Sequence, residues 1–62
     1  MFNLKVGDII RDNKFGDCEV IKVSHIGDLA KGPKEGVNIW YGEQELIRLK
    51  NDGEIDIIYV GN

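Results

Sequence analysis

The sequence predicts an all-β fold, a small five-stranded antiparallel barrel of the SH3-like kind. Eight glycines divide the 62 residues into pieces of about four to ten residues, a length that suits strands better than helices. Several of these pieces are rich in Val, Ile and Tyr, which favour strands. A chain of this length holds one domain. Residues 1–62 are therefore expected to form a single barrel, whose closure would remove exposed sheet edges.

The first three expected strands cover residues 8–11, 18–24 and 37–41. In the third strand, Val37, Ile39 and Tyr41 alternate with Asn38 and Trp40. Alternation of this kind places one set in the core and the other set in solvent. Two registers stay open, one with Trp40 exposed and one with Trp40 as the core anchor, because a small barrel often buries its one tryptophan.

The second half of the chain predicts two further strands. Residues 42–43 fit a two-residue turn, and a fourth strand is expected over residues 45–50. A helix over residues 43–50 is the alternative, because most of those residues are good helix formers. Residues 51–53 predict a hairpin turn, with Gly53 supplying positive φ, before a fifth strand over residues 54–60.

Residues 24–36 are expected to form the longest loop of the domain. The segment is polar and rich in glycine and holds the one proline of the chain, a composition typical of loops. One short turn is expected at Leu29 and Ala30.

Composition excludes several classes of function. The net charge of −3 and the pI near 4.9 argue against a protein held to nucleic acid by its net charge. No apolar run approaches the roughly 18 residues of a membrane span, so a cytoplasmic protein without a membrane partner is expected. One cysteine cannot form an internal disulfide or a multi-thiolate metal site. No metal and no cofactor are expected.

An enzyme is not expected either, because no nucleophile and base stand together in the sequence. His25 is the sole imidazole, and Asp28 is the one acidic residue within three positions of it. Cys18 lies between Asp17 and Glu19, and acidic neighbours disfavour a reactive thiolate. Cys18 is therefore expected to pack as a small hydrophobic residue.

The first third of the chain carries a recurring barrel pattern. Residues 4–10 read LKVGDII, residues 15–20 read FGDCEV, and Val23 follows. This pattern resembles the signature of Tudor-like and KOW-like SH3 barrels. The C-terminal Tudor domain of UvrD-type helicases and the RNA-polymerase-interacting domain of CarD-type transcription regulators are the most similar families.

The resemblance implies roles for particular residues. In those families glycine and aspartate open the first strand, and the apolar positions, here Ile10, Val20 and Val23, fill the barrel. Gly16 matches the first glycine of the bend between the first two strands, whereas Cys18 stands where the families have a second glycine. The resemblance also implies binding to a protein, RNA polymerase in those families, through a sheet edge and nearby exposed apolar groups.

The predicted function is a non-catalytic protein-interaction module. It would be a small bacterial or phage accessory protein that binds the transcription machinery or another host protein. The residues expected to bind the partner are Trp40, Asn38, Phe15 and His25. An exposed tryptophan is enriched in binding hot spots.

The alternative is a weak nucleic-acid-binding KOW-like barrel. The residues expected to contact phosphates are Lys14, Lys31 and Lys34, with an exposed aromatic ring for stacking. Three lysines on an acidic chain would give weak, salt-sensitive binding. The oligomeric state stays open.

Overall fold

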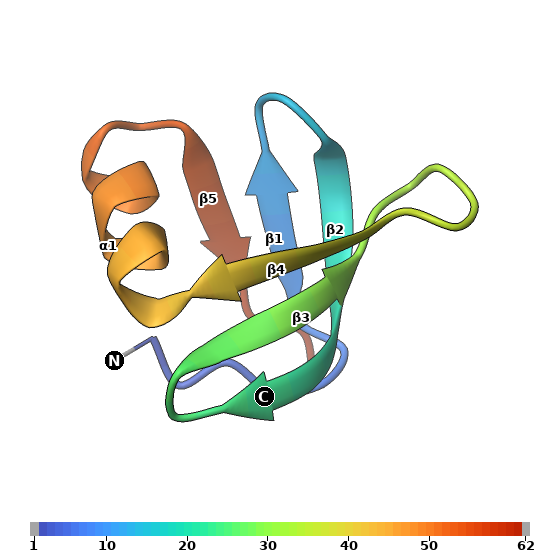
Figure 1. Cartoon of the computed structure of the whole chain (residues 1–62), viewed down its shortest axis with the longest axis horizontal. Coiled ribbons are helices and arrows are strands. Elements are labelled where there is room, and N and C mark those ends of the chain that lie inside the picture. Colours follow the sequence, from blue (N-terminus) through green and yellow to red (C-terminus); the bar gives the residue numbers. More distant parts are fainter. Residues whose placement is uncertain (1, 62) are drawn as a thin grey trace.

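A single antiparallel sheet of five strands dominates the fold (Figure 1). The computed structural model describes residues 2–61. The elements along the chain are β1 (Ile9–Asp12), β2 (Gly16–Ser24), β3 (Gly27–Lys31), β4 (Asn38–Gly42), α1 (Glu43–Asn51) and β5 (Ile55–Ile58). The strands lie in the order β4-β3-β2-β1-β5, and every neighbouring pair is antiparallel.

The long strand β2 bends the sheet. Its first half pairs with β1 and its second half with β3, and the β2–β3 register shifts between Val20 and Lys22. An irregularity of this kind kinks a strand and increases its twist. The sheet is therefore barrel-like, as the sequence predicts, but it does not close, because β4 and β5 do not pair. Helix α1 packs against both of these edge strands instead.

The core lies between the two bent parts of the sheet and α1. Its buried apolar members are Leu4, Ile10, Cys18, Val20, Ala30, Tyr41, Leu46 and Ile55. Two of the residues that the resemblance places in the core are there, but Val23 is 40% exposed. The register shift before Lys22 places Val23 opposite the buried Asp28, on the face of Val20. Val23 borders an open cavity at that end of the sheet, so it stays exposed.

The pair Gly7-Asp8 directly precedes β1. The buried Asp8 carboxylate accepts hydrogen bonds from the amide of Lys5 (2.9 Å) and from the amide of Val60 (2.9 Å). One carboxylate thus orders the turn before β1 and ties the segment after β5 to it.

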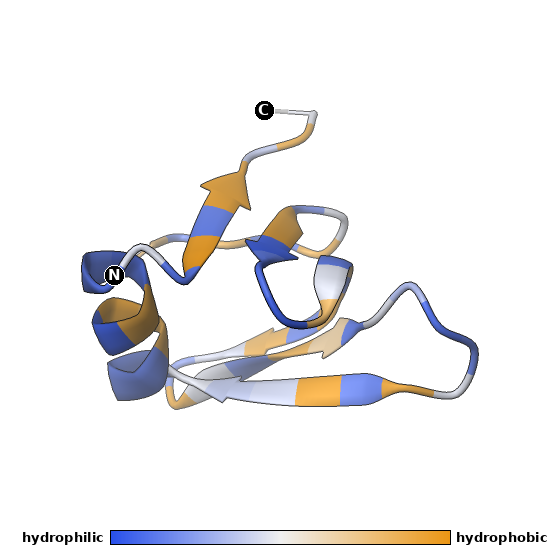
Figure 2. Ribbon diagram, turned by 90° about the horizontal axis from the view of Figure 1, so that it is seen from above, coloured by the Kyte–Doolittle hydropathy of each residue, from blue (hydrophilic) through white to orange (hydrophobic). Residues whose placement is uncertain are grey.

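The strand expected over residues 45–50 is wrong, and the helix alternative over residues 43–50 is confirmed, since α1 occupies that segment and begins directly after Gly42. Leu46 is buried and Leu49 packs against the core, a spacing of three residues that places both on one helix face. Figure 2 shows hydrophobic residues on the side of α1 toward the sheet. Acidic residues in the first turn and basic residues in the last also favour a helix, because they complement its dipole.

Residues 51–53 do not form a hairpin turn. The amide of Glu54 donates to the carbonyl of Leu49 (2.9 Å), and the amide of Gly53 donates to that of Lys50 (3.1 Å). These are the two bonds of a Schellman motif, which ends a helix on a glycine with positive φ. Gly53 has the expected positive φ of 72°, but it ends a helix rather than joining two strands.

Residues 24–36 are not one long loop, because β3 lies within them. Leu29 and Ala30 are strand residues rather than a turn. Asp28 and Ala30 alternate with Leu29 along this strand, and their side chains are buried on its inner face. A strand whose inward positions hold an alanine and an aspartate lacks the large apolar residues by which strands are recognised.

Candidate functional site

Strand β4 presents an unpaired edge. Within residues 2–61, no strand pairs with the side of β4 that faces away from β3. The amide of Gly32 donates to the carbonyl of Val37 (2.8 Å) at one end of the β3–β4 ladder. Paired and unpaired residues alternate along an antiparallel ladder, so the main-chain N–H and C=O groups of Asn38 and Trp40 point away from β3. The hydrogen bond from the amide of Glu43 to the carbonyl of Ile26 (3.1 Å), at the other end of the ladder, fits the same alternation.

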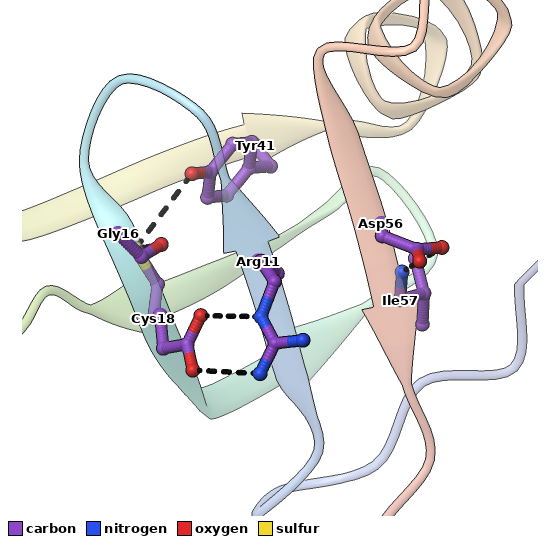
Figure 3. A network of polar contacts seen from close by, with 7 residues as sticks. Arg11, Gly16, Cys18, Tyr41, Asp56 and Ile57 are labelled. Atoms are coloured by element: carbon purple, nitrogen blue, oxygen red, sulfur yellow. Dashed lines mark hydrogen bonds and ion pairs between the residues drawn. The ribbon is translucent and has the colours of Figure 1, made fainter.

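The other sheet edge, on β5, is protected. Asp56 and Ile57 lie side by side on this strand, and the amide of Ile57 donates to the Asp56 carboxylate at 3.0 Å (Figure 3). That carboxylate also lies 3.5 Å from the Lys50 ammonium at the end of α1. An edge amide capped by a side chain and flanked by charges is a poor template for another strand.

Trp40 lies on the outer face of β4, which decides between the two registers left open by the sequence. Its side chain is 49% exposed, whereas Tyr41 is buried. Trp40 stands opposite Leu29, and Asn38 stands opposite Lys31, so these four side chains share one face. The indole packs over Gly27, where an added Cβ would lie 2.5 Å from the ring.

The inner side of the same edge opens onto a cavity of about 280 Å³. We call it the edge pocket. It lies between β4, the β1–β2 turn and α1, and its walls include Phe15, Ile39, Leu49, Glu45 and Glu54. Trp40 also contributes to the lining of this pocket. The edge of β4 therefore runs between the exposed face of Trp40 and a hollow with apolar walls.

Asp12 fixes the position of Phe15 beside this edge. One oxygen of its carboxylate accepts hydrogen bonds from the amides of Lys14 (2.7 Å) and Phe15 (3.2 Å), which orders the β1–β2 turn. The other oxygen accepts the Tyr41 hydroxyl at 2.7 Å. Burial and this bond to Asp12 both raise the pKa of Tyr41. The sequence did not mark Asp12 as a site residue, although an aspartate at the first position of a turn, whose side chain accepts the amide two residues later, is a known turn signal.

The core beneath the site is inert. Figure 3 shows the Tyr41 side chain pointing across the interior toward Cys18 on β2, with 3.9 Å between the hydroxyl oxygen and the sulfur. Burial raises the pKa of the Cys18 thiol. Cys18 packs as a small hydrophobic residue, as predicted. Arg11, also in Figure 3, forms an exposed two-hydrogen-bond pair with Asp17 across β1 and β2.

The structure separates the three lysines of the nucleic-acid alternative. Lys14 and Lys34 flank a second cavity, of about 260 Å³, whose apolar lining is Phe15, Pro33 and Val37. Lys31 stands opposite Asn38 on the outer face of the sheet. Two of the three cations therefore gather around an exposed aromatic ring, and the third belongs to the Trp40 face.

His25 lies in the exposed turn between β2 and β3. It does not line the edge pocket but borders a third cavity, of about 350 Å³, together with Asp28 and Glu43. Asp28 is buried. Burial raises the pKa of its carboxyl most strongly. A hydrogen bond from the backbone of Ser24 lowers this pKa, and the charge of Glu43 raises it.

Two kinds of site are absent from the part of the chain that the structure describes. No group of three or more His, Cys, Asp or Glu side chains in residues 2–61 is arranged to hold a metal ion. None of the helical segments in this range has the length and apolar character needed to span a membrane.

Comparison of this chain with protein-family models, with curated proteins and with solved structures finds no match. The resemblance to Tudor-like and KOW-like barrels therefore stays a prediction from residues in the first third of the chain.

Proposed function

We propose that this protein is a non-catalytic protein-interaction module whose partner adds an extended strand to the free edge of β4. The observation that carries the proposal is the orientation of Asn38 and Trp40, whose main-chain groups face away from β3 with no strand beside them. Strand addition gains affinity from such main-chain groups and specificity from pockets for alternate side chains.

The surroundings of this edge support the proposal. Trp40 is half exposed on one side of it, and Phe15 is held in place on the other side through Asp12. Rigid aromatic groups bind with little loss of conformational entropy and dominate interface hot spots. Native proteins usually protect long sheet edges, as β5 does here, so an unprotected β4 favours a role in binding. The transcription machinery, and RNA polymerase within it, is the partner that the Tudor-like resemblance suggests.

The test is affinity capture from a lysate of the source organism, with and without nuclease, using two matched variants of one residue. Asn38→Pro removes the edge amide, which makes no bond to β3, and proline is tolerated on edge strands. Asn38→Ala removes the side chain but keeps the amide. We expect Asn38→Ala to retain a stoichiometric partner and Asn38→Pro to lose it, while both variants unfold cooperatively.

A second pair of variants addresses the tryptophan. Trp40→Ala is expected to lose the partner, whereas Val60→Ala, a similarly exposed apolar residue, is expected to keep it. The proposal would be refuted if Asn38→Pro and Trp40→Ala both recovered as much partner as the wild-type protein does. Loss of cooperative unfolding in Trp40→Ala alone would mean that Trp40 acts in the core, and the decision would then rest on Asn38→Pro.

The gathering of Lys14 and Lys34 around Phe15 favours nucleic-acid binding as a second candidate function. Cations beside an exposed aromatic ring suit stacking on single-stranded nucleic acid. Under this alternative the captured material disappears after nuclease treatment. The double variant Lys14→Glu/Lys34→Glu would abolish retention of nucleic acid, and Asn38→Pro would leave it unchanged.

A further inference from the structure

The edge pocket combines apolar walls with an acidic rim. Phe15, Ile39 and Leu49 supply the apolar groups, and Glu45 and Glu54 supply two carboxylates. The carboxylate of Glu45 is 3.7 Å from the Arg48 guanidinium, an exposed contact that binds weakly. Asp12 also lines the pocket, but its two oxygens already accept three hydrogen bonds.

Lys14 is the one cation among the described residues that line the pocket, and it contacts an aromatic ring. The Lys14 ammonium lies over the ring of Phe15, 5.3 Å from its centroid, a cation–π contact. Three carboxylates, of Asp12, Glu45 and Glu54, line the pocket against the single ammonium of Lys14, and the whole chain carries a net charge of −3.

The alternation of free and paired main-chain groups along β4 determines which side chains of an added strand would enter this pocket. An added residue opposite Trp40 would exchange hydrogen bonds with it and share its outward face. Residues opposite Ile39 and Tyr41 would point to the inner side, where these two residues line the edge pocket. Side chains alternate along a strand, so every second residue of the partner would face the acidic pocket.

We infer that the partner segment is an extended stretch of another protein with lysine or arginine at the positions that face the edge pocket and apolar residues at those that face Trp40. This inference rests on the proposed function of strand addition. A long basic side chain lays its aliphatic stem along apolar groups and its charged head against carboxylates, and the pocket offers both. An apolar side chain there would desolvate Glu45 and Glu54 without pairing them.

Charge also argues against a second copy of this chain as the occupant. A copy paired along the same edge would bring the same acidic rim toward its partner, and like charges across an interface disfavour association.

The test uses the fluorescence of Trp40, the single tryptophan of the chain, in titrations with three capped peptides. The first alternates Val and Lys, the second alternates Val and Glu, and the third is the Val/Lys peptide with N-methyl groups on alternate amides along its bonding edge. We expect the Val/Lys peptide to bind about tenfold more tightly than the Val/Glu peptide, from two exposed charge pairs. N-methylation should abolish binding, because it removes the strand hydrogen bonds.

The double variant Glu45→Gln/Glu54→Gln should remove most of the preference for lysine. Its matched control is Glu19→Gln/Glu35→Gln, which changes the net charge equally at exposed residues that do not line the edge pocket. The control should keep the preference, and both variants should retain the wild-type circular dichroism spectrum.

The outcomes separate this inference from the proposed function. Equal binding of the Val/Lys and Val/Glu peptides, with N-methylation still blocking both, overturns the basic preference and leaves strand addition standing. Equal binding of the methylated and unmethylated peptides overturns strand addition itself. Failure of all three peptides to bind overturns the inference, and the Asn38→Pro capture then decides the proposed function. Self-association that Asn38→Pro abolishes would assign the edge to a second copy.

Discussion

The hydroxyl of Tyr41 on β4 donates a 2.7 Å hydrogen bond to the carboxylate of Asp12 at the end of β1. Both residues are buried, and they are 29 positions apart in the sequence. The second oxygen of Asp12 orders the turn that carries Phe15. One carboxylate thus joins the free edge strand to the turn that forms the opposite wall of the edge pocket.

Replacement of Tyr41 by phenylalanine is expected to lower the free energy of unfolding by about 1–3 kcal/mol, because it leaves a buried carboxylate oxygen without its donor. Urea denaturation followed by circular dichroism measures the change. The control is Tyr59→Phe: its hydroxyl donates to the carbonyl of Phe2 (2.7 Å), but Tyr59 is exposed and water can replace the lost donor. Equal losses in the two variants would contradict a special role for Asp12.

Replacement of Gly27 by alanine is expected to destabilise the fold by about 1–3 kcal/mol, as overpacking does. The added Cβ would lie 2.5 Å from both the Trp40 ring and the carbonyl oxygen of Tyr41. The indole must move, so tryptophan fluorescence should change with the stability. Gly42→Ala is the control, because its nearest contact is Trp40 Nε1 at 4.0 Å. Wild-type stability and fluorescence in Gly27→Ala would show that the indole does not depend on this glycine.

Local patterns predicted the parts of the fold that local physics determines. The alternation in residues 37–41 put Trp40 and Tyr41 on opposite faces of the strand without deciding which face is buried, and β-branched residues marked β1 and most of β2. The segment of α1 stayed open between strand and helix because Leu46 and Leu49 suit either over so short a segment. Strand β3 was missed because its buried positions hold Asp28 and Ala30, whose place in the core depends on neighbouring strands.

The candidate site could be predicted only in part. Exposure of Trp40 and Asn38 was one of two registers that the alternation allows, and the position of Phe15 in a turn follows from the glycine beside it. Which strand lies at a sheet edge is a property of topology, not of local sequence. The edge pocket therefore could not be foreseen, since it joins Phe15 to residues of α1 that are 30 or more positions away.

Replacement of Asp28 by asparagine is expected to stabilise the protein at neutral pH. Burial raises the pKa of this carboxyl, so the folded state binds its proton more tightly than the unfolded state does. Stability from Asp28 is then fully present below the unfolded pKa of about 3.9 and falls as pH rises to the folded pKa. The asparagine side chain does not ionise, so the variant does not lose this stability as pH rises. Its amide oxygen can still accept the hydrogen bond from the backbone of Ser24.

Thermal unfolding of this variant and of the wild type between pH 3 and pH 7 measures the effect. The difference in melting temperature should be largest at pH 7 and vanish at about pH 3.5, below the unfolded pKa. His25 and Glu43 border the same cavity, so the His25→Ala variant serves as a reference for titration of the imidazole. A destabilised Asp28→Asn at pH 7 would mean that the ionised carboxylate has a stabilising partner.

The thiol of Cys18 is expected to resist labelling in the folded protein. Its side chain is fully buried, and burial raises its pKa, so both access and the reactive thiolate are reduced. A chromogenic disulfide reagent should react slowly in buffer and at once in denaturant. The reaction rate under native conditions then reports opening of the sheet around β2. Destabilising variants such as Tyr41→Phe should raise that rate in proportion to the population of the open state, whereas Asn38→Ala, at an exposed position, should not. Rapid stoichiometric labelling of the native wild type would instead place Cys18 at the surface.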